Sequence, residues 1–62
     1  MKMFVWDGVL TDYTSGMIVV LANSLEEARE VAMKTDKYVG KETTADPTVY
    51  ETPSCVYVYG GG

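Results

Sequence analysis

One amphipathic helical pattern lies between two β-rich stretches, and this arrangement limits the possible folds more than any other feature of the chain. Ser24 and Glu27 have the S-x-x-E spacing of a capping box, in which side chains satisfy backbone N–H groups at the start of a helix. Apolar residues then recur at helical spacing, at Leu25, Ala28, Val31 and Ala32. We therefore expect a helix from Ser24 to about Thr35.

Two β-forming segments precede this helix. Lys2–Leu10 is interrupted by Asp7-Gly8, and either half alone would make a very short hairpin arm. We therefore expect one bent strand with a bulge at Gly8. Met17–Ala22 is a continuous apolar run, which is typical of a central strand covered on both faces.

Two shorter β-forming segments follow the helix. A polar stretch that we expect to be irregular, Asp36–Pro47, leads to the predicted strands Thr48–Thr52 and Cys55–Tyr59. The predicted order is β-β-α-β-β. This order indicates an α+β fold, with a small antiparallel or mixed sheet of three to four strands and one helix packed on one face. Residues 1–62 are expected to form a single domain in which Gly60–Gly62 is a flexible tail.

The chain has few means of reinforcing so small a core. A domain of 62 residues buries only about 60% of the surface that its unfolded chain exposes. Cys55 is the single cysteine and histidine is absent, so neither an internal disulfide nor a zinc site of the usual kind is expected. Because partners are the remaining reinforcement, we expect self-association, most simply as a homodimer.

Catalytic groups are equally scarce. Without histidine there is no Ser–His or Cys–His pair, and no glycine-rich phosphate loop precedes the helix. Cys55 lies beside Val56 and Tyr57, which favours a buried, inert thiol. The sequence therefore indicates a protein that is not an enzyme and that carries no cofactor.

The net charge and the apolar runs of the chain limit the partners and the location that we expect. Nine acidic and five basic residues give a net charge of −4, which disfavours direct binding of nucleic acid because Lys and Arg dominate phosphate contacts. The longest apolar run, Met17–Ala22, is too short to cross a membrane. Met1–Asp7 lacks the long apolar core of a signal peptide, so we expect a cytoplasmic protein.

Aromatic side chains supply the candidate interaction surface. Within Cys55–Tyr59, strand alternation places Val56 and Val58 on one face and the tyrosines on the other. If the valines face the helix, the tyrosines form either a partly solvated face or an interface with another protein. On the second interpretation the interface, with its acids at the rim, comprises Trp6, Asp7, Asp12, Tyr13, Tyr57 and Tyr59.

Val9–Gly16, the run MIVVLANSLEEARE and the terminal YGGG resemble small accessory proteins encoded by phages and prophages. This resemblance implies a contact inhibitor of a host defence system, as anti-CRISPR proteins are, which acts in the host cytoplasm. No functional residue follows from it. The leading hypothesis is therefore a non-enzymatic protein-interaction module.

Two alternatives remain open. A β-β-α-β order followed by C-terminal glycines resembles β-grasp sulphur carriers and ubiquitin-like proteins, which implies activation at the terminal Gly61 and Gly62. Those families end on two glycines, whereas this chain ends on three. The other alternative is a dimeric protein that sequesters a small nucleotide, which would need a pocket that no motif marks.

Overall fold

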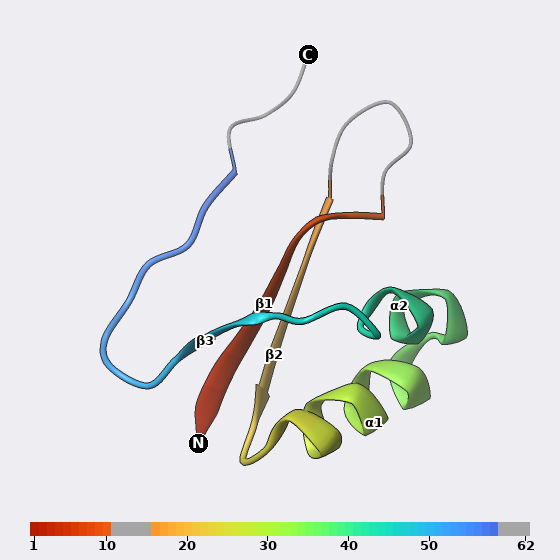
Figure 1. Ribbon diagram of the computed structural model, residues 1–62, viewed down its shortest axis with the longest axis horizontal. Helices are drawn as coiled ribbons and strands as arrows, with labels where there is room; N and C mark the ends of the chain where they lie inside the picture. Colours follow the sequence, from red (N-terminus) through yellow and green to blue (C-terminus); the bar gives the residue numbers. More distant parts are fainter. Residues whose placement is uncertain (11–15, 59–62) are drawn as a thin grey trace.

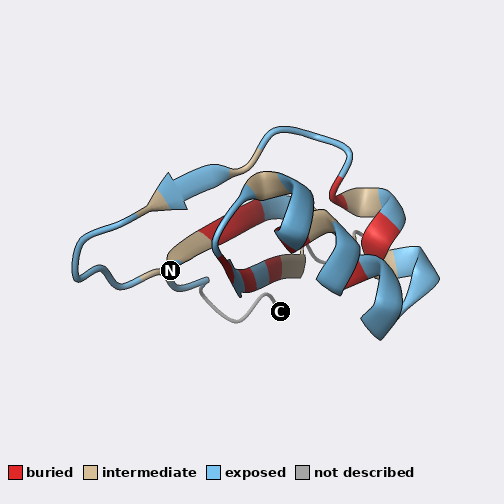
Figure 2. Ribbon diagram, turned by 90° about the horizontal axis from the view of Figure 1, so that it is seen from below, coloured by how far each residue is buried: buried red, intermediate tan, exposed pale blue. Residues whose placement is uncertain are grey.

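The computed structural model describes residues 1–10 and 16–58, which form a helical layer on one face of a small sheet (Figure 1). In chain order the elements of these residues are β1 (Lys2–Val9), β2 (Gly16–Ala22), α1 (Leu25–Thr35), α2 (Lys37–Glu42) and β3 (Thr48–Tyr50). Figure 2 shows the buried residues gathered where the helices meet the sheet. The predicted α+β class is confirmed.

β1 is the middle strand of the sheet. The strand order among the described residues is β2-β1-β3, and both pairs are antiparallel. The pairing of β1 with β2 shifts between Asp7 and Val9, where Gly8 adopts a φ of 70°. A positive φ favours glycine, because a side chain would clash with the backbone there. The predicted bent strand with a bulge at Gly8 is therefore confirmed.

β2 corrects the prediction of a central strand covered on both faces. It lies at an edge of the described sheet, and its burial alternates along the chain. Ile18 and Val20 are buried, whereas Val19 is 49% exposed and Leu21 is 63% exposed. The helices therefore cover one face of β2 only.

The capping signals explain both helices. Ser24 Oγ accepts the Glu27 N–H at 3.1 Å, and Glu27 Oε1 accepts the Asn23 N–H at 2.8 Å, which confirms the predicted start of α1. The prediction that residues 36–47 are irregular is wrong, because α2 lies within them. Asp36 caps α2, since its Oδ1 accepts the N–H groups of Tyr38 and Val39 at 2.8 and 3.2 Å.

The C-terminal part differs from the predicted β-β-α-β-β order. Described residues 55–58 belong to no strand of the sheet, so the order of the elements within residues 1–10 and 16–58 is β-β-α-α-β. Tyr59 and the predicted tail, Gly60–Gly62, lie outside the described residues. Cys55 is exposed, which contradicts the prediction of a buried thiol. Residues 55–58 belong to no strand of the described sheet, and Figure 1 shows them running away from α1 and α2.

Candidate functional site

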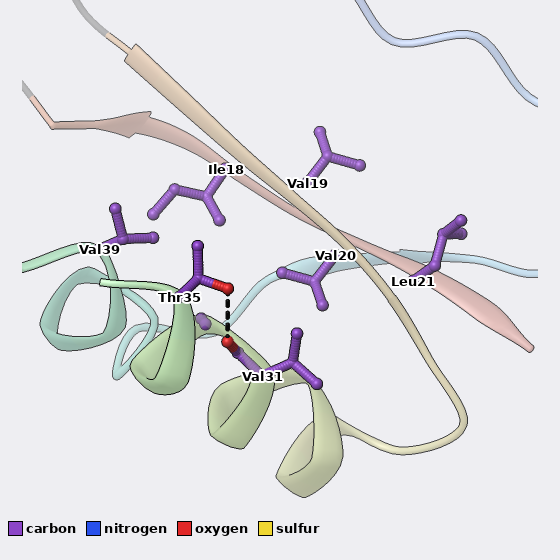
Figure 3. Close-up of a pocket in the computed structure, with 8 residues that line it drawn as sticks. Ile18, Val19, Val20, Leu21, Val31, Thr35 and Val39 are labelled. Carbon is purple, nitrogen blue, oxygen red and sulfur yellow. Dashed lines mark hydrogen bonds between the residues drawn. The ribbon is translucent and has the colours of Figure 1, made fainter. Parts of the chain in front are cut away.

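An apolar groove separates β2 from the helices on the side where α1 faces the edge of the sheet (Figure 3). Its cavity of about 230 Å³ is lined by Ile18, Val19, Val20, Leu21, Val31, Ala32, Thr35 and Val39. Thr35 is the single hydroxyl residue of this lining, and its Oγ1 donates to the Val31 carbonyl oxygen at 2.9 Å. The groove therefore offers aliphatic groups to an occupant, with its one side-chain hydroxyl bonded within α1.

The strand edge that borders this groove lacks the protective residues that edge strands usually carry. No strand lies beyond β2 in the part of the chain that the structure describes. Alternate residues of an edge strand direct their N–H and C=O groups outward, and proteins usually protect such edges with charges, prolines or bulges. Gly16–Ala22 contains no charged residue and no proline, and the bulge of the sheet is on β1. β2 is therefore a template on which another strand can pair.

The second face of β2 is also apolar. Val19 and Leu21 point away from the groove interior, as Figure 3 shows. Their partners on β1 are Val5 and Met3, and Met3 is paired in turn with Tyr50 of β3. An added strand would therefore meet apolar side chains on both faces of the sheet.

The opposite flank of α1 is closed by polar bonds. Arg29 Nε donates to the carbonyl oxygen of Thr43 at 2.8 Å, and Nη2 reaches those of Thr44 and Ala45 at 3.3 and 3.2 Å. Trp6 Nε1 also donates to the Ala45 carbonyl oxygen, at 2.8 Å. These bonds hold the connection between α2 and β3 against the helix.

The structure corrects the predicted role of Trp6 as an exposed anchor. Its side chain is 1% exposed, stacks on Phe4 with ring centroids 6.4 Å apart, and belongs to the core beneath the helices. Phe4 and Trp6 are two residues apart on the central strand, so both face the same helical layer. Burying the indole N–H costs little free energy, because the N–H donates a hydrogen bond to the Ala45 carbonyl oxygen.

Of the other predicted interface residues, the structure describes Asp7 and Tyr57. Asp7 is exposed at the bulge, where its Oδ1 accepts the Gly8 N–H at 2.9 Å. Tyr57 is 69% exposed in the segment that follows β3. Asp12, Tyr13 and Tyr59 lie outside the described residues, as do Gly61 and Gly62.

Sequence reasoning missed the groove, although one signal for it was present. An uncharged β run followed at once by a capped helix fits a strand buried on both faces, and it equally fits an edge strand with an open groove. Pattern alone does not separate the two, because a continuous apolar run is compatible with both.

Other kinds of site receive no support from the described residues, and the comparisons with known proteins add none. Among residues 1–10 and 16–58, no group of three or more His, Cys, Asp or Glu could hold a metal ion. None of the helices in this same part of the chain is long and apolar enough to cross a membrane. No family model matches the chain, and comparison with curated proteins and with solved structures finds no similar protein.

Proposed function

We propose that this chain is a non-enzymatic protein-interaction module that binds an extended, apolar segment of a protein along the edge of β2. The supporting observation is the coincidence of an uncharged strand edge with an aliphatic groove beside it. Extended peptides bind such edges by adding a strand, whose main-chain hydrogen bonds supply affinity. Pockets for alternate side chains then supply specificity.

The two faces of β2 define the segment that fits. Every second side chain of the added strand would enter the groove above Val20 and beside Val31. The intervening side chains would lie on the other face, next to Val19 and Leu21. We therefore expect a segment with β-branched or aromatic residues at most positions and no charge at its centre.

The resemblance to phage accessory proteins gives this proposal its more specific form. An inhibitor of a host defence protein would act by occupying an extended segment which that protein needs. The net charge of −4 suits a basic partner, since complementary charge raises association rates. On this proposal the protein acts in the host cytoplasm, and it does not bind nucleic acid directly.

The alternatives gain less from the structure. The carrier hypothesis depends on Gly61 and Gly62, which lie outside the described residues. A nucleotide needs charged or amide groups to recognise its phosphate and base, and the groove is lined by aliphatic residues and one internally bonded threonine. The observed groove therefore favours an apolar peptide over a nucleotide.

Selection from a displayed library of random peptides tests the proposal without knowledge of the natural partner. We expect the selected peptides to share alternating β-branched and aromatic residues, and to shift the NMR amide signals of Gly16–Ala22 most strongly. Val19→Lys should weaken their binding at least tenfold, because it places a charge on the edge. Val49→Lys is the matched control, since Val49 is 45% exposed on the opposite edge of the sheet. Equal binding to both variants, or shifts confined to other elements, would contradict the proposal.

A further inference from the structure

We infer that the segment bound along β2 is residues Cys55–Val58 of a second copy of this chain, so that two copies exchange their C-terminal segments. This inference rests on the proposed function, because it places a segment of a second copy on the same edge of β2 that a host segment would occupy. The chain contains an edge that can accept a strand and a strongly β-forming segment that belongs to no strand of the described sheet. The two features suit one another in chemistry, shape and position.

The chemistry of the segment matches the edge. Residues 52–58 carry no charge, and residues 55–58 are a cysteine followed by two valines that flank a tyrosine. Val58 is 49% exposed and Tyr57 is 69% exposed, so apolar surface remains in water. Pairing with β2 would bury that surface and add main-chain hydrogen bonds along the edge of β2.

The alternation of the segment matches the two faces of β2. With Val56 and Val58 directed into the aliphatic groove, Cys55 and Tyr57 lie on the opposite face of the sheet. There the tyrosine ring meets the exposed side chains of Val19 and Leu21. Cross-strand pairs of an aromatic with a β-branched residue are among the favourable pairs of antiparallel sheets.

The position of the segment indicates a second copy and not its own edge. The segment follows β3, which lies at the opposite edge of the sheet from β2, with β1 between them. Figure 1 shows it running beside the sheet, away from α1 and α2. To reach the far side of β2 in its own copy, the chain after β3 would have to turn back and cross both β1 and β2, a distance of about three strand spacings or 14 Å. The groove of another copy carries no such restriction.

The area of the chain is consistent with a dimer. A compact monomer of 6.8 kDa exposes about 4,000 Å², whereas this chain exposes 4610 Å². Reciprocal exchange buries two identical segments and closes with twofold symmetry.

Light scattering on a sizing column, at about 100 μM full-length chain, tests the inference with three valines of similar exposure. We expect a dimer of the wild-type chain, and monomers for both Val19→Lys in the groove edge and Val58→Asp in the segment. Val49→Lys, on the opposite edge, should remain a dimer. Circular dichroism of each variant verifies that the fold is intact. A monomeric wild-type chain would overturn the inference, as would a Val58→Asp variant that stays dimeric while Val19→Lys does not, since β2 would then pair with β2.

Mixing adds a result that a general loss of solubility or folding could not produce. Val19→Lys keeps an intact segment and Val58→Asp keeps an intact groove, so a mixture of the two should form a heterodimer with one complete site. Absence of this heterodimer, when the wild-type chain is a dimer, argues against exchange.

Cross-linking locates the segment. Leu21→Cys should form a disulfide with Cys55 of another copy on mild oxidation, as peptide mapping would show, and Val49→Cys should not. Equal cross-linking at both positions would place the segment elsewhere.

A separate peptide distinguishes failure of this inference from failure of the proposed function. A synthetic peptide of residues 52–62 should shift the β2 amide signals of the Val58→Asp variant, whose groove is intact. If library peptides bind β2 and this peptide does not, the self-exchange is wrong and the proposed function stands. If neither binds, both are wrong.

Discussion

The two flanks of α1 differ in the contacts that they make. On one flank Arg29 binds three successive carbonyl oxygens, and the Trp6 indole holds the third of them as well. On the other flank Val31 and Thr35 face a cavity, with the uncharged edge of β2 beyond them. The closed flank uses directional bonds between groups of the same chain, and the open flank presents methyl groups and a strand edge.

Because of this difference, we expect the closed flank to contribute mainly to stability and the open flank mainly to binding. A flank whose polar groups are already paired has little to gain from a partner, because binding would have to break good hydrogen bonds. An apolar groove beside an unpaired edge gains by burial and by main-chain bonding. We therefore expect substitutions on the closed flank to change the free energy of unfolding, and substitutions on the open flank to change binding.

The largest effect is expected at Trp6, on the closed flank. Trp6→Ala should cost about 3–5 kcal/mol, because it empties the centre of the core. That loss is similar to the whole stability of about 3–9 kcal/mol expected of 62 residues. Trp6→Phe keeps a ring beside Phe4 and removes the bond to the Ala45 carbonyl, so it should cost about 1–3 kcal/mol in urea unfolding. Unfolding of Trp6→Phe at the wild-type midpoint would show that this bond contributes nothing.

Substitution of Gly40 tests whether α2 supports both flanks of α1. This helix contributes Val39 to the groove on the open flank, and it leads directly to Thr43, whose carbonyl oxygen binds Arg29 on the closed flank. A Cβ added at Gly40 would lie 2.6 Å from Met33 Cα, too close for any rotamer change to relieve. Gly40→Ala should therefore cost about 1–3 kcal/mol in urea unfolding and also weaken peptide binding. The control is Gly8→Ala, which meets nothing within 4 Å but is strained by its φ of 70°. It should lower stability without changing affinity for peptides, and unchanged binding by Gly40→Ala would contradict the shared role of α2.

Substitution of Arg29 should affect the closed flank less than substitution of Trp6. Arg29→Ala should cost about 1–2 kcal/mol in urea unfolding, an amount reduced by the partial exposure of the guanidinium. Arg29→Lys should recover only part of this, since a single ammonium cannot reach three carbonyls in a fork. Lys34→Ala, which removes an exposed pair with Glu30, is the control and should cost less than about 0.5 kcal/mol. Equal effects of Arg29→Ala and Lys34→Ala would show that the closed flank is not held by Arg29.

The smallest effect on stability is expected on the open flank. Val31 is 42% exposed, so Val31→Lys should change the free energy of unfolding by less than about 0.5 kcal/mol. The same variant should weaken binding of library-selected peptides at least tenfold in titration calorimetry, because it places an ammonium in the groove. Val49→Lys should leave binding unchanged. A Val31→Lys variant that binds like wild type would exclude the groove as the binding site.

The local elements of this chain could be predicted because their signals act between near neighbours. Ser24 and Glu27 are three residues apart and satisfy N–H groups of the same turn, so the start of α1 follows from the sequence. The bulge likewise depends on a single glycine. The signal for the start of α2 is equally local, since Asp36 Oδ1 accepts N–H groups of the next turn, but the polar residues around it are also typical of a loop.

The candidate site could not be predicted in the same way, because it depends on which strands become neighbours. Both faces of the Phe4–Val5–Trp6 stretch are apolar, so alternation does not tell which face the helices cover. The structure places Phe4 and Trp6 under the helices, and the indole reaches a carbonyl 39 residues away in the chain. An aromatic residue that suits an interface thus became a core residue through a long-range contact.

Composition and local pattern were enough to establish a small acidic α+β chain with a capped helix after an apolar strand. The order β2-β1-β3, and with it the open edge, arose from pairing β1 with two segments on its two sides. The physical reason is the separation in sequence between the residues that interact. Caps and bulges are set by bonds within a few residues, whereas the place of a strand depends on the sum of long-range pairing and packing energies. In this protein that sum favours Thr48–Tyr50 beside β1 and leaves β2 without a second neighbour among the described residues.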